Sequence, residues 1–205
     1  MPRPRLDHVR KAQILAAAAE VMSERGYANV RVVDIATAAG TSPAAILYWF
    51  SGKDELLAEA LRLREQQFHD TYTVKAEHQA TASAKLRVLV EAMLYHYDWP
   101  LWMELCVVAL RDRNAAAERD RLDRRWRAAL RSVIREGQSS GEFLQGDAEH
   151  VMFVLAALLD GLAPLLALKA KGVTRDRVEK VLLAEASQLL GPGFDARPLR
   201  RTRGR

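Results

Sequence analysis

The sequence predicts an all-α protein of about nine helices arranged in two domains. Every segment with a readable hydrophobic period repeats its apolar residues at helical spacing, and no segment alternates apolar and polar residues as a half-buried strand does. The chain has 205 residues, of which 49% are apolar and 28% are charged, as is ordinary for a soluble globular protein with a proper core. We therefore expect a small N-terminal domain of three helices and a larger C-terminal helical domain.

The first two helices are predicted from the glycines that end them. A first helix spans about 7–25 and ends at Gly26. A short amphipathic helix then begins near Val33 and ends at Gly40, because glycine tolerates the left-handed conformation that closes helices. A tight turn follows at once.

The third helix is predicted from its cap. Ser42 offers a side-chain oxygen to the unpaired amides of the next turn, and Pro43 stands at the first helical position, where a missing N–H is tolerated. Ile46 and Phe50 are four residues apart and are expected to point into the core. The residues left on outward faces are Ala44, Ala45, Tyr48 and Trp49.

Two short helices joined by a tight glycine turn are the layout of a helix-turn-helix reader of double-stranded DNA. A further helix begins at Ser51 with Asp54 as a near-capping box, and Lys53 in its first turn is unfavourable for the helix dipole unless a phosphate approaches. Alanine cannot hydrogen-bond base edges, so we expect apolar contact such as thymine methyls, with DNA shape adding specificity. For Tyr48 and Trp49 the alternative is that they only cover the core. The residues expected at the DNA are Arg31, Thr41, Ser42, Pro43, Ala44, Ala45, Tyr48, Trp49 and Lys53.

Residues 10–61 resemble the N-terminal DNA-binding domain of the tetracycline-repressor (TetR) family. Arg31 stands where the family usually has Ser or Thr, and Leu47 fills its commonest tyrosine position. The resemblance implies that the last two long helices pack against those of a second subunit. The matching run is Ile35-Ala36, Ala39-Gly40, Ser42, Ile46, Tyr48, Phe50, Lys53 and Leu56-Leu57.

The remaining six helices follow from apolar stripes and caps. They are expected at 53–77, 83–97 and 101–111, then in one helix ending near Gly137, one capped by Asp147 and one capped by Thr174. We expect residues 1–53 to form the DNA-binding domain, 53–77 to connect it, 78–192 to form a regulatory and dimerisation domain, and 193–205 to be a disordered basic tail.

The segment Val151–Leu168 is apolar throughout apart from Asp160, and Pro164 should bend it. A membrane span is the rival interpretation, but the segment is short and carries an acid at mid-length. A helix that is apolar all round is instead expected to be buried on several sides, here by a second copy of the chain. The residues expected at this dimer interface are Val151, Leu155, Leu158, Leu162, Val178, Val181 and Leu182.

Aromatic residues concentrate in 95–106, around the break at Pro100. They indicate either a bulky core or a pocket for a small hydrophobic or cationic effector. If the effector is cationic, Asp98, Glu104 or Asp160 could supply a negative charge near it. The run W-x-x-W-x-E and the later Asp160-Gly161-Leu162 resemble the C-terminal domain of the choline-responsive BetI-like branch of the family. The residues expected at the ligand are Tyr95, Trp99, Trp102, Met103, Cys106, Trp126 and Phe153.

Charge and chemistry narrow the function further. The net charge of +5 is concentrated at the two ends of the chain. Residues 1–53 hold seven Lys/Arg against four Asp/Glu, and residues 191–205 hold five Arg against one Asp. Such positive ends are expected either for contact with phosphates or for a solvated tail. The single cysteine, Cys106, fits a reducing cytoplasm and reads as a core residue or, less often, a thiol sensor. No signal peptide, metal-ligand spacing, phosphate loop or catalytic signature is present, so we expect neither an enzyme nor a cofactor.

The leading hypothesis is a cytoplasmic, homodimeric, ligand-responsive repressor that binds a pseudo-palindromic operator. One alternative is a regulator without a small ligand, or an activator. Another is an all-α interaction or small-molecule-binding protein whose motif no longer reads DNA.

Overall fold

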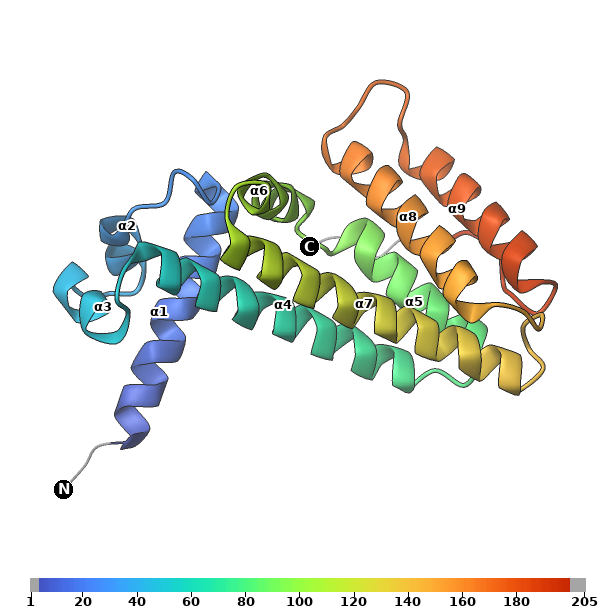
Figure 1. Cartoon of the computed structure of the whole chain (residues 1–205), viewed down its shortest axis with the longest axis horizontal. Helices are drawn as coiled ribbons and strands as arrows, with labels where there is room; N and C mark the ends of the chain where they lie inside the picture. Colours follow the sequence, from blue (N-terminus) through green and yellow to red (C-terminus); the bar gives the residue numbers. More distant parts are fainter. Residues whose placement is uncertain (1–3, 200–205) are drawn as a thin grey trace. The chain divides into compact units, whose positions relative to one another are not determined.

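The computed structural model describes residues 4–199, and within that range it contains nine α-helices and no strand (Figure 1). The all-α prediction is therefore confirmed. The helices are α1 (Pro4–Arg25), α2 (Val32–Ala38), α3 (Pro43–Trp49), α4 (Lys53–Glu77), α5 (Ala82–Tyr95), α6 (Trp99–Ala109), α7 (Arg113–Ser139), α8 (Ala148–Ala167) and α9 (Arg175–Leu190). They form two compact units, Met1–Phe68 with Pro100–Arg119, and His69–Trp99 with Asp120–Arg205.

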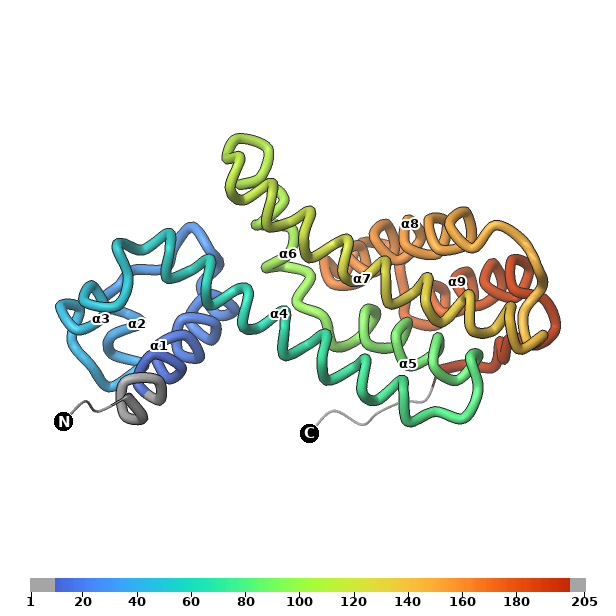
Figure 2. Tube along the Cα trace, turned by 60° about the horizontal axis from the view of Figure 1, so that its bottom comes forward, coloured from blue at the N-terminus to red at the C-terminus, as the bar shows by residue number. Residues whose placement is uncertain are grey.

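In the first unit, α2 packs against both α1 and α3 (Figure 2). Met22 of α1, Ile35 of α2 and Ile46 of α3 are each at most 1% exposed and meet in one small core. Leu57 of α4 is fully buried as well. The two short helices, α2 and α3, are therefore held by apolar burial rather than by helix propensity, since an isolated seven-residue helix would not be stable.

In the second unit, α8 packs against α9 and α5, and α8 and α9 lie side by side (Figure 1). Leu86, Leu130 and Leu155 are fully buried there. Among the described helices, α8 alone is long and apolar enough to cross a membrane by length and composition, and 33% of its apolar window is buried within the chain. Packing within the subunit thus covers only part of this helix.

Side-chain caps at α8 and α9 confirm two predicted helix starts. The Asp147 carboxylate accepts hydrogen bonds from the first amides of α8 at 2.9 and 3.2 Å, and the Thr174 hydroxyl accepts one from the Arg177 amide at 3.3 Å. The start of α4 agrees with the predicted range 53–77, whereas its cap differs from the one predicted with Ser51 and Asp54. The helix begins at Lys53, and Glu55 rather than Asp54 accepts from the Ser51 amide and hydroxyl, both at 2.6 Å, because its longer side chain reaches back over the first turn.

The C-terminal segment corrects another expectation. Residues 193–199, predicted as the start of a disordered tail, pack on the second unit, and Phe194 and Leu199 are each 4% exposed. The Arg87 guanidinium donates to the carbonyls of Arg197 at 2.6 Å and Pro198 at 3.0 Å. The composition of this segment indicated disorder. Composition alone does not show that Phe194 and Leu199 are buried against the rest of the unit. Residues 200–205 of the predicted tail lie outside the described residues.

Replacing Arg87 with alanine is expected to release this segment. The guanidinium is the shared donor for the backbone of 195–198, and hydrogen bonds to a charged group contribute about 1.5–3 kcal/mol. Arg87→Ala should lower the melting temperature and accelerate chymotryptic cleavage after Phe194, which is buried while the segment is anchored, several-fold. Lys85→Ala, which removes only a surface ion pair with Glu136, serves as the control. Equal cleavage rates in the two variants would contradict this role of Arg87.

Candidate DNA interface

The turn between α2 and α3 is closed by the contacts that the sequence predicted. Gly40 has a φ of +61°, and the Thr41 amide donates to a carbonyl of α2 at 2.9 Å. The Ser42 hydroxyl oxygen accepts from the Ala45 amide at 3.1 Å, and Pro43 is the first residue of α3. These bonds satisfy the backbone at both sides of the turn and fix the direction in which α3 leaves it.

The burial of one side of α3 determines which side faces outward. Ile46 is fully buried and Phe50, the residue that ends the helix, is 2% exposed, as predicted. The opposite side consists of Ala44, Leu47 and Tyr48, which we call the α3 face. Leu47 is 54% exposed and Tyr48 is 81% exposed. The α3 face is therefore free of contacts with the core of its own unit.

The two aromatic residues of α3 occupy different environments. Tyr48 is too exposed to cover the core, so that alternative is wrong for this residue. Trp49 is half-buried, and its ring meets the Tyr48 ring edge to face, with centroids 5.3 Å apart and planes at 87°. The indole thus supports the position of the phenol, whose hydroxyl extends into solvent.

The two cations expected at phosphates lie at the ends of the motif. Arg31 is exposed at the N-cap of α2, and its amide donates to the Asp34 carboxylate at 3.3 Å. Lys53 is half-buried at the first turn of α4, where its ammonium lies 3.4 Å from the Ala28 carbonyl. The Lys53 ammonium therefore has a weak intramolecular partner that a phosphate oxygen could replace.

Leu47 is the residue of the α3 face that the sequence-based site omitted. It was considered only as a replacement for the family's tyrosine and not as a contact in its own right. The signal for it was available, because Ala44 and Leu47 are three residues apart and must share one side of a helix once Ile46 is buried. Ala45, which was predicted at the DNA, is only half-exposed.

The loop between α1 and α2 is fastened by α6. The Glu104 carboxylate accepts a hydrogen bond from the Tyr27 amide. Gly26 has a φ of +78°, and a Cβ at this position would collide with the Glu104 carboxylate. Burial raises the pKa of the Tyr27 phenol above its usual value. Glu104, suggested as a counter-charge for a cationic ligand, is thus engaged in positioning the DNA-binding helices.

Two of the predicted ligand residues are engaged in contacts of the second unit. Trp99 is 2% exposed, and its indole N–H donates to the Met93 carbonyl at 2.7 Å. The Tyr95 hydroxyl donates to the Glu179 carboxylate, and the Arg175 guanidinium lies 3.6 Å from the centre of the Tyr95 ring. Burial, followed by the bond to Glu179, raises the pKa of the Tyr95 phenol well above its usual range.

The other predicted ligand residues are distributed over both units. Trp102, Met103 and Cys106 are half-buried residues of α6 in the first unit, and Trp126 is half-buried in α7. Phe153 is 58% exposed on α8, with the Arg127 guanidinium 5.8 Å from its ring centre, so it lies on the surface rather than in an enclosed pocket.

A cavity of about 530 Å³ lies between α4 and α5 in the second unit. The rings of Tyr72 and His96 stack there at 5.6 Å with planes at 18°, and the Lys75 ammonium lies 4.5 Å from the Tyr72 ring centre. Glu91 adds a carboxylate to the lining. This cavity combines aromatic faces with charges of both signs, and none of the seven predicted ligand residues lines it.

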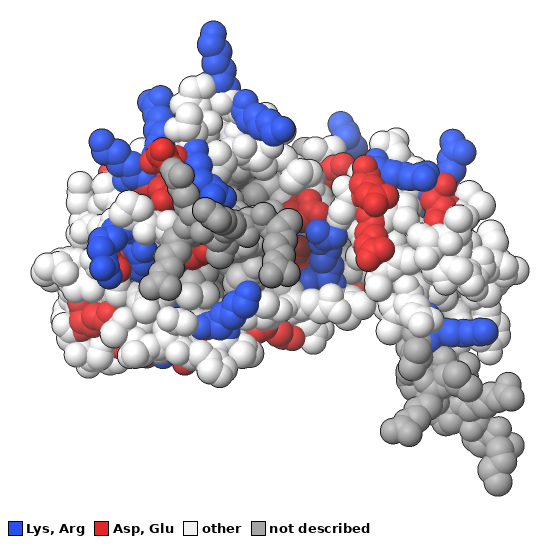
Figure 3. All heavy atoms as spheres, turned by 180° about the vertical axis from the view of Figure 1, so that it is seen from behind, with Lys and Arg blue, Asp and Glu red and all other residues white. Residues whose placement is uncertain are grey.

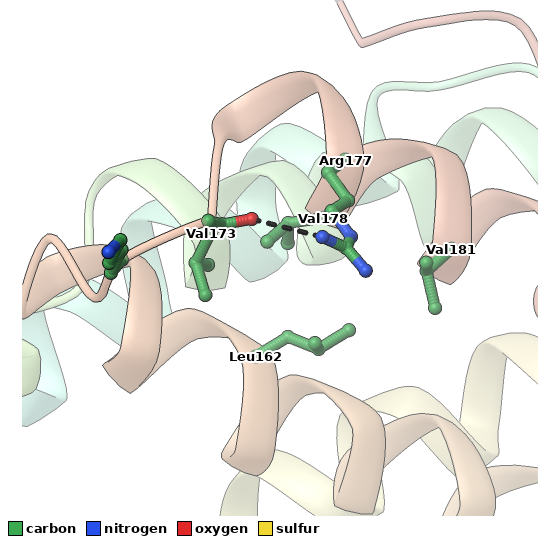
Figure 4. A pocket seen from close by; sticks show the side chains of 7 residues that line it. Leu162, Val173, Arg177, Val178 and Val181 are labelled. Carbon is green, nitrogen blue, oxygen red and sulfur yellow. Dashed lines mark hydrogen bonds between the residues drawn. The ribbon is translucent and has the colours of Figure 1, made fainter.

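A smaller cavity of about 260 Å³ lies where α8, α9 and their connecting loop meet (Figure 4). Leu162 lies opposite the start of α9, and Arg177 projects into the space between them while its guanidinium donates to the Gly172 carbonyl at 3.3 Å. The lining is Leu162, Lys171, Gly172, Val173, Arg177, Val178 and Val181.

The predicted dimer interface divides into core and surface. Four of its residues are buried in the subunit itself, because α5 and α9 cover that side of α8, and assigning them to an interface between subunits was wrong. These are Val151, Leu155, Val178 and Leu182. The other three stay predictions, since Leu158 and Leu162 are half-buried and Val181 is 39% exposed.

The outward side of α8 is apolar along much of its length. Phe153, Leu165 and Leu168 are 58%, 42% and 62% exposed, and we call these residues with Gly161 the α8 strip. Gly161 is exposed, and a Cβ added there would meet no atom within 4 Å. Exposed apolar side chains that share one side of a helix are a candidate surface for contact with another protein.

Basic and acidic side chains alternate on the face shown in Figure 3 instead of forming one continuous basic surface. Several charged side chains of the described residues are paired, such as Arg125 with Asp70 at 2.5 Å and Arg131 with Glu149 at 2.5 Å. This face therefore offers no continuous basic surface for phosphate contact.

Two family profiles match the chain. The profile of "Bacterial regulatory proteins, tetR family" matches residues 14–60, which include the whole α3 face. The profile of "BetI-type transcriptional repressor, C-terminal" matches residues 82–191, which is more than half of the chain.

Individual relatives cover almost the whole chain. The HTH-type transcriptional regulator PksA of Bacillus subtilis (strain 168) is 28% identical over 197 residues, 92% of this chain and 94% of PksA. The HTH-type transcriptional regulator BetI of Escherichia coli (strain K12) is 24% identical over 188 residues, 88% of this chain and 94% of BetI. The crystal structure of a transcriptional regulator from Saccharomonospora viridis in complex with choline is 30% identical with a TM-score of 0.78, covering 87% of this chain and 95% of that one.

Proposed function

Because this chain belongs to the tetR family of bacterial regulatory proteins and is a transcription regulator rather than an enzyme, we propose that it is a homodimeric repressor released from a pseudo-palindromic operator by a small-molecule effector. The α3 face carries this proposal. One seven-residue helix touches few base pairs, so useful affinity needs two copies at half-sites about 34–36 Å apart. A protein with this role acts in the cytoplasm.

The α8 strip supports the homodimer. Its leucines and Phe153 are exposed on the single chain, and the half-buried Leu158 and Leu162 and the exposed Val181 extend the same apolar surface to α9. A second copy that lays its own α8 and α9 on this surface would bury all of them and give a four-helix bundle. The cavity beside Leu162 and Val181 leaves room for a side chain of that partner.

A cationic effector is supported by two observations. The C-terminal match is of the BetI type, and the similar Saccharomonospora viridis structure holds choline. The cavity between α4 and α5 offers the Glu91 carboxylate and the rings of Tyr72 and His96 to a quaternary ammonium, which would have to take the place of the Lys75 ammonium over the Tyr72 ring. Release from DNA requires that the effector have different affinities for two states of the dimer, which differ in the distance between their two DNA-binding units.

The proposed function can be tested with the purified full-length protein. Its operator is selected from random duplex DNA, and binding is then measured by fluorescence anisotropy with and without choline. We expect an inverted repeat to be enriched and choline to weaken binding to it. Enrichment of a repeat with no response to choline or to other quaternary ammonium ions would favour a regulator without a cationic ligand. Failure to enrich any sequence would contradict the operator-binding proposal.

Replacing Lys53 with alanine is expected to weaken binding to operator and random DNA alike. We assign one phosphate per subunit to the Lys53 ammonium, whose bond to the Ala28 carbonyl is weak, so the slope of log affinity against log salt should fall by about one for each half-site. Lys53→Arg keeps the charge and should keep the slope, and Lys180→Ala, an exposed lysine of α9, should change neither quantity. An unchanged slope in Lys53→Ala would remove this residue from the phosphate contacts.

A further inference from the structure

We propose that Leu47 determines operator specificity by packing against the C5-methyl group of a thymine in the major groove. This inference rests on the proposed function, because it assumes that the α3 face enters the groove of an operator. It adds to the proposed function the kind of contact that gives specificity, which is an apolar contact and not a hydrogen bond to a base.

The first argument is the absence of side chains that recognise bases by paired hydrogen bonds. The segment 41–49, which runs from the turn to the end of α3, contains no Arg, Lys, Asn, Gln, Asp or Glu. Bidentate recognition of guanine needs Arg or Lys, that of adenine needs Asn or Gln, and cytosine is recognised by Asp or Glu. None of these pairings is available to α3.

The second argument concerns the hydroxyl groups that the turn and α3 do offer. The Ser42 oxygen accepts a hydrogen bond from the Ala45 amide at 3.1 Å, so its primary role is to cap the helix. Thr41 is half-buried in the turn, and the Tyr48 hydroxyl is free to donate or accept. A hydroxyl pairs with donors and acceptors alike and discriminates poorly between bases.

The third argument is the shape of the α3 face. Ala44 and Leu47 lie one turn apart on the same side, where the small methyl of Ala44 allows a close approach to DNA and the longer Leu47 extends beyond it. Leu47 is 54% exposed although it is a large aliphatic residue in a well-packed unit. The C5-methyl of thymine is the apolar group that the major groove of unmodified DNA presents.

The experiment removes single methyl groups from the DNA. Each thymine of the selected operator half-site is replaced in turn by deoxyuridine, which lacks only the C5-methyl, and the affinity of the full-length protein is measured by anisotropy. Burial of one methyl group is worth about a four-fold change in affinity. We expect one thymine in each half-site to show this loss.

Leu47→Ala assigns that loss to the side chain. In this variant the thymine and deoxyuridine operators should bind equally, because the partner of the methyl group is gone. Leu110→Ala removes a leucine that is 81% exposed in the same unit but outside the motif, and it should retain the four-fold discrimination. Both leucines are exposed, so neither substitution opens a cavity in the core.

The outcomes separate this inference from the proposed function. Sequence-specific operator binding with no deoxyuridine effect at any thymine would overturn the role of thymine methyls while leaving the operator intact. A deoxyuridine effect that persists in Leu47→Ala would assign the methyl contact to another residue and overturn the role of Leu47. Absence of any sequence preference would refute the proposed function and this inference with it.

Discussion

Ala44→Glu is expected to abolish operator binding while leaving the protein folded and dimeric. Ala44 is exposed at the N-terminal end of the α3 face, where a carboxylate would be brought against the negatively charged groove. Placing like charges together in an interface costs several kcal/mol, so the loss should be on the order of 100-fold or more in affinity. Fluorescence anisotropy against the selected operator measures it.

The position of Ala44 keeps this test separate from folding. It is the second residue of α3, where a glutamate interacts favourably with the helix dipole, so the melting temperature should not fall. Ala44→Gln has nearly the same size without the charge, so it measures the effect of bulk alone and should bind more tightly than Ala44→Glu. Native-like affinity in Ala44→Glu would show that the α3 face does not enter the groove.

Gly161→Glu is expected to convert the dimer to a monomer and thereby to weaken operator binding. Added atoms at Gly161 meet nothing within 4 Å in the subunit, so the larger side chain is accommodated by the single chain. In a twofold dimer the two glutamates would enter the α8 strip and block its close packing. Separating two linked half-site contacts should lower the apparent affinity on the order of 10²–10⁴-fold.

Light scattering on a sizing column tests the state of association directly. Glutamate is a better helix former than glycine, so the monomer should keep or gain helical stability by about 0.5–1 kcal/mol, and any loss of association cannot be ascribed to unfolding. Ala117→Glu, an exposed alanine of α7, is the control and should remain dimeric. A Gly161→Glu variant that stays dimeric would place the interface elsewhere.

Local signals explain why the motif could be predicted so well from the sequence. Gly40 closes α2, Ser42 caps α3, and the four-residue spacing of Ile46 and Phe50 orients the helix, each through contacts within a few residues. The caps of α8 and α9 are equally local. Such features depend on backbone hydrogen bonds that nearby residues determine, and they need no knowledge of distant packing.

Features that depend on long-range packing were not predictable in the same way. The sequence shows that α8 is apolar on all sides, but not which side α5 and α9 cover, and so Val151 and Leu155 were assigned to the wrong surface. The bond from the Tyr27 amide to Glu104 joins residues far apart in the chain. The anchoring of 193–199 by Arg87 likewise has no signal in local composition.

The central claim, that two copies of the α3 face read one operator, is tested most directly by one binding comparison. Fluorescence anisotropy of the full-length protein is measured at two salt concentrations against the selected palindrome, the same duplex with one half-site scrambled, and a fully scrambled duplex. We expect tight binding to the palindrome and a large loss when either half-site is removed. Equal, weak and strongly salt-dependent binding to all three duplexes would contradict the claim, because it would mean that the protein contacts phosphates without reading sequence.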